Sequence, residues 1–209
     1  GSSNVMVAIY AGWNSAYVSK VEENMFRMFQ YITSVFKASV GERYLILCYP
    51  VALDGKRIAV GEFSNSCGGD AGPGVDPGNN SHAMFHRWNG PWPPYGMKGG
   101  SREIWFTEGA TIYYDNKIPV KVHFDIPDFR DYANYNVLKW NWAEYRKIIG
   151  TKFDAPVTDW EKLGPDTDYH GWFIYSRKAS LIHFLLDKTL QKATLTKSLD
   201  DVMAHMYAR

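Results

Sequence analysis

Cysteine, charge of one sign and long apolar runs are all scarce in this sequence. Two cysteines in 209 residues, Cys48 and Cys67, are too few for a disulfide framework. We interpret both as buried thiols, although they could pair if the strands that carry them lie side by side. A formal net charge of +1 provides no field that would attract nucleic acid or an anionic membrane. The composition therefore argues against disulfide-rich and nucleic-acid-binding classes.

No apolar run approaches the roughly 18 residues that a membrane-spanning helix needs. No signal peptide is visible either. We therefore expect a soluble protein with no membrane span in this chain, and we favour the cytoplasm. Residues 1–3, Gly-Ser-Ser, are typical of an expression scar, so a targeting segment could have been removed.

The chain does have enough apolar and aromatic material for one sizeable core. Hydrophobic residues make up 45% of it and aromatic residues 16%. Neither an internal repeat nor a linker divides it, so we expect one domain, 1–209. The expected order is a helix, a small β-hairpin and then a mainly helical body, which is an α+β fold.

A turn signal organises the predicted β-structure. Residues 44–49 have the aromatic and branched character of a strand, and 57–63 is expected to pair with them as a hairpin. Asp54-Gly55 between them is typical of a type I′ turn. Residues 67–80 are rich in Gly, Pro, Asp and Asn and predict a loop.

Capping residues mark the predicted helices. Ser19 with Glu22 forms a capping box that would open a helix to about residue 38, with apolar residues at helical spacing. Asn80 or Ser81 could cap the helix after the loop. Further helices are expected from near Ser101 and at about 128–149, 170–192 and 198–208, with caps at Asp128 and Ser198.

The most informative pattern is a pair of histidines followed by a carboxylate. His82 and His86 are four residues apart, so on a helix both imidazoles lie on one face and can reach one ion. Glu108 follows 22 positions after His86. Zinc favours nitrogen and oxygen ligands of this kind and keeps one position for water in catalytic sites. We predict a Zn²⁺ site at these three residues. Ordinary histidines on a helix face are the alternative.

Ala83 occupies the position on which catalysis would depend. In the H-E-x-x-H pattern the residue after the first histidine is a glutamate, which takes a proton from the zinc-activated water. Here that residue is Ala83. The sequence thus predicts a metal site that lacks its general base.

These blocks resemble the gluzincin zinc metallopeptidases, especially the glycyl aminopeptidase family and more distantly the aminopeptidase N family. HAMFHRWN at 82–89 resembles the H-E-x-F-H-x-W-N block of glycyl aminopeptidases, with alanine in place of glutamate. WFTEGATIYYD at 105–115 resembles their W-x-S-E-G-x-T-x-Y-Y-D block, whose glutamate is the third zinc ligand. SLDDVMAHMY at 198–207 resembles the last helix of the catalytic domain. The resemblance implies a thermolysin-like gluzincin catalytic domain with peptidase activity, most often that of an aminopeptidase.

The resemblance also implies a tyrosine that hydrogen-bonds the oxyanion of the tetrahedral intermediate. YSRKA at 175–179 resembles the Y-x-x-K-G or Y-x-K-G element of these families, which makes Tyr175 the preferred candidate. Tyr169 is the alternative. Either residue could instead be an ordinary aromatic residue of the core.

A contact to the substrate is implied before the zinc helix. In the relatives a glycine-rich strand presents a glutamate to the free amine of the peptide, and Glu62 in VGEFSNS at 60–66 is the matching candidate. One of the family's paired glycines is missing here, which leaves exopeptidase specificity open. Glu62 could equally be an exposed strand residue, and the strand edge could bind an extended peptide by strand addition.

Two functions stay open. One is a zinc peptidase in an inactive form, and the other is a non-catalytic zinc protein that binds peptides or a protein partner. We favour the first, with Ala83 as a deliberate replacement, because natural drift would also have eroded the ligands and the tyrosine. The expected partner is a peptide, with no nucleic acid and no membrane, and the oligomeric state stays open.

Overall fold

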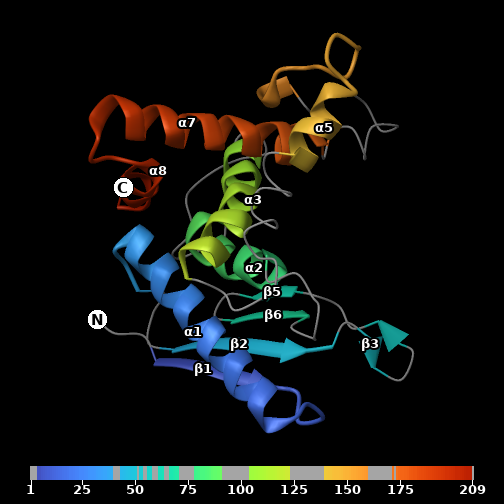
Figure 1. Cartoon of the computed structure of the whole chain (residues 1–209), viewed down its shortest axis with the longest axis vertical. Helices are drawn as coiled ribbons and strands as arrows, with labels where there is room; N and C mark the ends of the chain where they lie inside the picture. The colour runs from blue at the N-terminus through green and yellow to red at the C-terminus, as the bar shows by residue number, and fades with distance from the viewer. Residues whose placement is uncertain are drawn as a thin grey trace.

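The computed structural model describes residues 4–39, 43–50, 52–53, 56–57, 61–63, 66–70, 78–90, 104–122, 139–159, 171 and 173–208. Between residues 52 and 79 the description covers the backbone alone. A sheet lies at one end of the molecule, with helices stacked above it (Figure 1). This arrangement is an α+β fold, as the sequence predicts.

The sheet has four strands in the order β1-β2-β6-β5. They are β1 (Asn4–Ile9), β2 (Arg43–Tyr49), β6 (Ser66–Asp70) and β5 (Gly61–Phe63). β1 and β6 both run parallel to β2, whereas β5 is antiparallel to β6. Parallel neighbours need a crossover connection, and helix α1 (Ser15–Phe36) supplies it between β1 and β2.

The predicted hairpin that pairs residues 44–49 with 57–63 is wrong. β6 lies between β2 and β5, so the two expected partners do not pair. The Asp54-Gly55 signal instead falls between β3 (Ala52–Leu53) and β4 (Lys56–Arg57), which form a small antiparallel pair of their own. The two turn residues themselves lie outside the described residues.

The predicted loop of residues 67–80 is also wrong at both of its ends. Its first residues belong to β6, and its last belong to α2 (Gly78–Asn89). Glycines disfavour strands, which is why this Ser-Cys-Gly-Gly-Asp segment resembles a loop. Pairing with β2 on one side and β5 on the other imposes the extended backbone that propensity alone does not predict.

Two predicted helix starts are displaced by about one turn. α1 begins at Ser15, because the Asn14 side chain accepts a hydrogen bond from the Tyr17 backbone N–H at 2.9 Å. Ser19 and Glu22 therefore lie inside the helix. Asn80 and Ser81 likewise lie within the first turn of α2 and are buried.

The core lies between the sheet and α1, α2 and α3 (Ile104–Lys121). Tyr44, Ile46 and Cys48 alternate along β2 and are all buried. Trp88 of α2 stacks on Phe36 of α1, with ring centroids 5.8 Å apart, and its indole N–H donates to the Ala38 carbonyl at 3.0 Å. The apolar spacing predicted for α1 is confirmed by its buried side chains, Val21, Met25, Met28, Phe29, Ile32, Val35 and Phe36.

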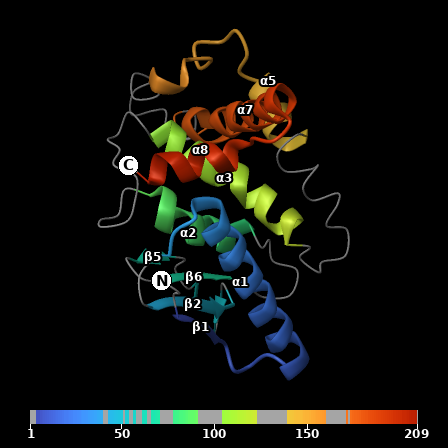
Figure 2. The same cartoon turned by 90° about the vertical axis from the view of Figure 1, so that its left-hand side faces the viewer.

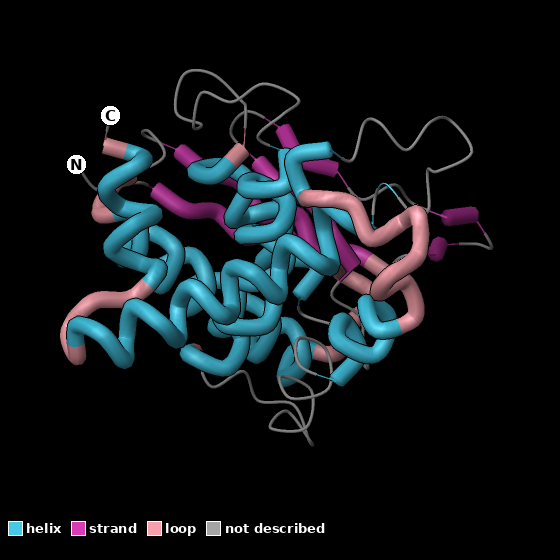
Figure 3. The backbone as a smooth tube through the Cα atoms, turned by 90° about the horizontal axis from the view of Figure 1, so that it is seen from above, coloured by secondary structure: helices cyan, strands magenta, loops and turns pink. Residues whose placement is uncertain are grey.

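The remaining helices follow α3 in the chain; those within residues 141–194 lie beyond α3, away from the sheet, whereas the last one packs against α1 (Figures 1 and 2). They are α5 (Asn141–Arg146), the π-helical η5 (Phe173–Lys178), α7 (Ala179–Thr194) and α8 (Leu199–Tyr207). Seen from above, the helices lie over the strands (Figure 3). Ser198 caps α8 in a capping box with Asp201, which confirms the predicted cap. In the described part of the chain, no helix combines the length and apolar character needed to cross a membrane.

Other predicted helix bounds are met only in part. The helix expected from near Ser101 begins at Ile104, and 101–103 lie outside the described residues. Within the described part of 128–149, α5 is the α-helix, and the proposed cap Asp128 lies outside it. The helix expected at 170–192 corresponds to η5 and α7, with a π-helical first turn that periodicity does not predict.

Candidate metal centre

α2 and α3 pack against each other and bring the three predicted ligands together. His82 and His86 lie one turn apart on α2, and Glu108 lies near the start of α3. Gly109 allows α3 to pass close to α7, because a Cβ at this position would lie 2.5 Å from the Ala179 Cβ. The small residue after Glu108 therefore permits the close approach of α3 and α7.

The donor atoms of these three residues are spaced as ligands of one ion. The two Nε2 atoms of His82 and His86 lie 3.0 Å apart. Glu108 Oε1 lies 3.2 Å from His86 Nε2, and Glu108 Oε2 lies 3.8 Å from His82 Nε2. Tetrahedral ligands at zinc distances would be separated by about 3.4 Å. The residues thus fit a zinc ion without rearrangement of the helices.

The other ring nitrogens fix the tautomers of both histidines. His82 Nδ1 lies 2.9 Å from Asp115 Oδ2, and a carboxylate can only accept, so this nitrogen carries the hydrogen. Thr111 donates its hydroxyl hydrogen to the Thr107 carbonyl at 2.7 Å and can accept from His86 Nδ1 at 3.5 Å. When both imidazoles are neutral, both Nε2 atoms are then acceptors that face each other. Two lone pairs and a carboxylate at this spacing repel unless a cation lies between them, which is why the donor set suits a metal.

Charge and exposure agree with a ligand role. Burial alone would raise the pKa of the Glu108 carboxyl, but when the two imidazoles are protonated, the hydrogen bond from His86 and the positive charges of both rings lower it below its usual range. Glu108 is therefore ionised at neutral pH. The His86 side chain is 6% exposed, while those of His82 and Glu108 are 28% and 26% exposed. One side of the centre therefore faces solvent, where a catalytic zinc keeps its open position.

Asp115→Asn is expected to weaken zinc binding by about ten- to a hundredfold. The amide has nearly the same size but loses the charge that orients His82 and raises the basicity of its ring. Competition against a chelator of known affinity at pH 7 measures the effect. Glu23→Gln, which alters an exposed ion pair with Arg27 on α1, is the matched control and should change nothing. Parent-like affinity in Asp115→Asn would contradict the orienting role.

Sequence reasoning missed Asp115 and Thr111, although a signal for them exists. Glu108, Thr111 and Asp115 follow one another at i, i+3 and i+7, so they share one face of α3. A helix that supplies one ligand at its start can therefore also supply the groups that orient both histidines. This face becomes recognisable only when α3 is paired with α2.

The other predicted site residues lie on α2, η5 and β5, or outside the described residues. Ala83 lies on α2 beside His82, is 4% exposed and packs into the core. Tyr175 is half-buried in η5, which packs against α3, and π-helical turns are frequent at functional sites. The backbone of Glu62 lies in the edge strand β5, opposite Cys67 of β6. Tyr169 lies outside the described residues, so its role stays a prediction.

His183 is a buried histidine that packs beside the metal centre. Its Nδ1 donates to the Ala179 carbonyl at 2.8 Å, and its ring contacts Trp105 and Phe106 in the first turn of α3. Within the described residues, Nε2 has no hydrogen-bond partner, and the residue is 1% exposed. Desolvation lowers the pKa of His183 to about 4.

The buried His183 is expected to make stability fall in acid. Between its folded pKa of about 4 and an unfolded pKa near 6.5, the unfolded chain binds the extra proton. Its contribution is thus complete above about pH 6.5 and is lost as pH falls toward 4, by about 2 kcal/mol between pH 7 and 5. Urea unfolding at both pH values, with chelator present, measures the loss. Asparagine does not titrate, so the free energy of unfolding of His183→Asn should fall by about 2 kcal/mol less between the two pH values than that of the parent. An equal loss of stability in both proteins would contradict the assignment to His183.

Comparisons with known proteins show the fold. No family model matches the chain, and no curated protein matches it. Among solved structures, the chain is similar to an aminopeptidase N family protein from Idiomarina loihiensis, with a TM-score of 0.71 and 18% sequence identity. The match covers 98% of this chain and 38% of that protein. This chain therefore has the fold of a part of that larger protein.

Proposed function

We propose that this chain is the catalytic domain of a zinc-dependent peptidase of the thermolysin-like gluzincin type, in a form that lacks its general base. The observation that carries the proposal is the convergence of His82, His86 and Glu108, with both rings oriented by α3. The aminopeptidase N family name of the structural neighbour supports peptide hydrolysis, and aminopeptidase action in particular.

A zinc ion bound there would lower the pKa of a bound water to about 7 and polarise the scissile carbonyl. Stabilisation of the reaction's oxyanion would depend on a residue of the chain. Tyr175 would donate its hydroxyl hydrogen to the oxyanion that develops on that carbonyl. The packing of η5 on α3, which carries Glu108, supports this role because it keeps the tyrosine's helix next to the ligand helix.

The proposed substrate is a peptide with a free amino end. β5 is the edge strand of the sheet and packs beside α2, which carries two of the ligands. Within the described strands β5 pairs with β6 alone, so an extended peptide could add to its other edge. Glu62 in this strand would pair with the α-ammonium of the peptide, as a carboxylate at a strand edge can.

A second candidate is a non-catalytic protein that keeps the metal to bind peptides or a protein partner. The observation that favours it is the burial of Ala83, whose methyl group packs into the core. This arrangement leaves α2 well packed without any group that could accept a proton at position 83. We prefer the peptidase because the ligands and the groups that orient them are all present.

The chain incubated with zinc and then desalted is expected to retain one zinc per molecule. His86→Ala should retain far less at the same folded fraction, because it removes the most buried of the three donors. Metal analysis by mass spectrometry gives the stoichiometry, and circular dichroism checks the fold. A parent protein that retains almost no zinc would refute the proposed function.

A further inference from the structure

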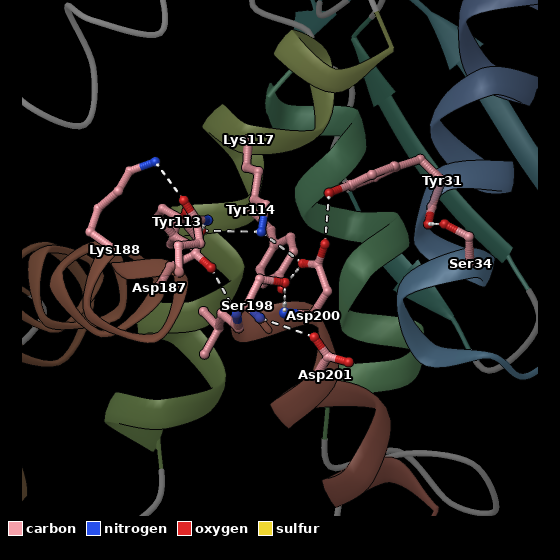
Figure 4. A network of polar contacts seen from close by, with 12 residues as sticks. Tyr31, Ser34, Tyr113, Tyr114, Lys117, Asp187, Lys188, Ser198, Asp200 and Asp201 are labelled. Carbon is pink, nitrogen blue, oxygen red and sulfur yellow. Dashed lines mark hydrogen bonds and ion pairs between the residues drawn. The ribbon is translucent and has the colours of Figure 1, made fainter. Parts of the chain in front are cut away.

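A buried polar network joins the last helix, α8, to the ligand helix α3 (Figure 4). We call it the Lys117 cluster. Its members are Tyr31 of α1, Tyr113, Tyr114 and Lys117 of α3, Asp187 of α7 and Asp200 of α8. The Lys117 side chain is 9% exposed and that of Asp187 is 1% exposed, so most of the cluster is shielded from solvent.

Each carboxylate of the cluster is well supplied with donors. Asp187 accepts from Tyr113, from Lys117 at 3.3 Å, from Gln191 at 2.9 Å and from the Leu199 backbone N–H at 2.7 Å. The last of these bonds holds the first turn of α8. Burial raises the pKa of Asp187, but the bonds from Leu199, Tyr113 and Lys117 and the charge of Lys117 prevail and lower it. The carboxylate is therefore charged at neutral pH.

Asp200 lies in the same first turn of α8 and connects three helices. It accepts from Lys117 at 2.7 Å, from the Tyr114 hydroxyl and from the Tyr31 hydroxyl at 3.2 Å. Its side chain is 30% exposed, so it completes the cluster from the solvent side. Breaking such a pair from one side leaves Lys117 buried with less compensation, which is costly.

Tyr114 is the link from this cluster to the metal centre. Its ring stacks on Phe85 of α2, with centroids 4.2 Å apart and planes 19° apart, and Phe85 lies between the two ligand histidines in sequence. The residue after Tyr114 is Asp115, which bonds His82. The hydroxyl of Tyr114 is held by Asp200. Tyr114 thus contacts α2 through its ring and α8 through its hydroxyl, one residue before Asp115.

We propose that Asp200 of the C-terminal helix is a positioning residue for the metal centre, acting through the hydroxyl of Tyr114, an inference that rests on the proposed function. In the described part of the chain, Asp200 reaches α3 through Tyr114 and Lys117. It holds Tyr114 and Lys117 so that Asp115 faces His82 and Glu108 faces both histidines. α8 then serves the metal centre as well as the core.

The test compares zinc affinity in two neighbouring variants of α8. Asp200→Asn removes the charge that holds Lys117 and Tyr114. It is expected to weaken zinc binding by about tenfold, which is the lower end of the loss seen when a group that orients a metal ligand is removed. Asp201→Asn weakens the capping box of the same helix without touching α3, and it should leave zinc affinity unchanged. Both are measured by chelator competition well below their unfolding midpoints, where a merely structural loss of stability does not alter affinity.

Tyr114→Phe provides the second arm because it keeps the ring stack and removes only the hydroxyl. It should weaken zinc binding about as much as Asp200→Asn, and the double variant should be no weaker than Asp200→Asn alone, since both changes act on the hydrogen bond between Tyr114 and Asp200. If Asp200→Asn does not fold, Tyr114→Phe decides alone. Zinc affinity within twofold of the parent in Tyr114→Phe, or an equal loss in Asp201→Asn, would overturn the inference while leaving the proposed function intact. A parent that binds no zinc would overturn both.

Discussion

Ala83→Glu is expected to raise hydrolysis of short peptides with a free amino end by about a hundred- to ten-thousandfold over the parent chain. The reason is that position 83 follows His82 on α2, where a glutamate can accept the proton of the attacking water and pass it to the leaving amine. Zinc content should stay at one per chain, because no ligand changes. Initial rates over a series of peptide amides give kcat/KM for both proteins.

Ala83→Gln is the control for volume. It adds nearly the same side chain at this buried position but cannot take up the proton, so it should stay inactive. Thermal unfolding shows whether the larger residues disturb the core around α2. If Ala83→Glu folds, holds zinc and cleaves no member of a broad peptide library, the peptidase proposal fails and the binding-protein candidate replaces it.

Tyr175→Phe in the Ala83→Glu background is expected to lower kcat by about a hundred- to a thousandfold, as the loss of one oxyanion donor does. KM should change little, because the hydroxyl acts mainly in the transition state. Tyr145→Phe is the matched control. Its hydroxyl donates to Asp154 at 3.1 Å and has no proposed role in catalysis, so kcat should be kept. An unchanged kcat in Tyr175→Phe would assign the donor to another residue, with Tyr169 as the first to test.

The metal ligands could be predicted from the sequence because their geometry is mostly local. Two histidines four apart on α2 share a face whatever the rest of the fold does. Glu108 was found through its sequence block, and its approach depends on Gly109, whose small size is visible in the sequence. Asp115 depends on how α3 is rotated against α2, and helix rotation is a property of packing that periodicity does not give.

The sheet shows the opposite case. Its strand order depends on which partners meet, and β1 pairs with β2 only after the 22-residue helix α1 has crossed between them. The Asp54-Gly55 signal correctly marks a reversal, but it belongs to β3 and β4 and not to the larger sheet. Turn chemistry is local, whereas strand pairing is not, so the hairpin prediction joined the wrong strands.

The X-ray absorption spectrum of the zinc-loaded chain at the zinc edge tests the central claim most directly. It should show two imidazoles and a carboxylate oxygen among the nearest neighbours, all at about 2.0–2.2 Å, and no sulfur. Asp115→Asn should keep this ligand set while weakening affinity, whereas His86→Ala should lose one imidazole. A zinc neighbour at about 2.3 Å, the distance of a thiolate such as that of Cys48 or Cys67, would contradict the site at His82, His86 and Glu108, as would a spectrum without imidazole.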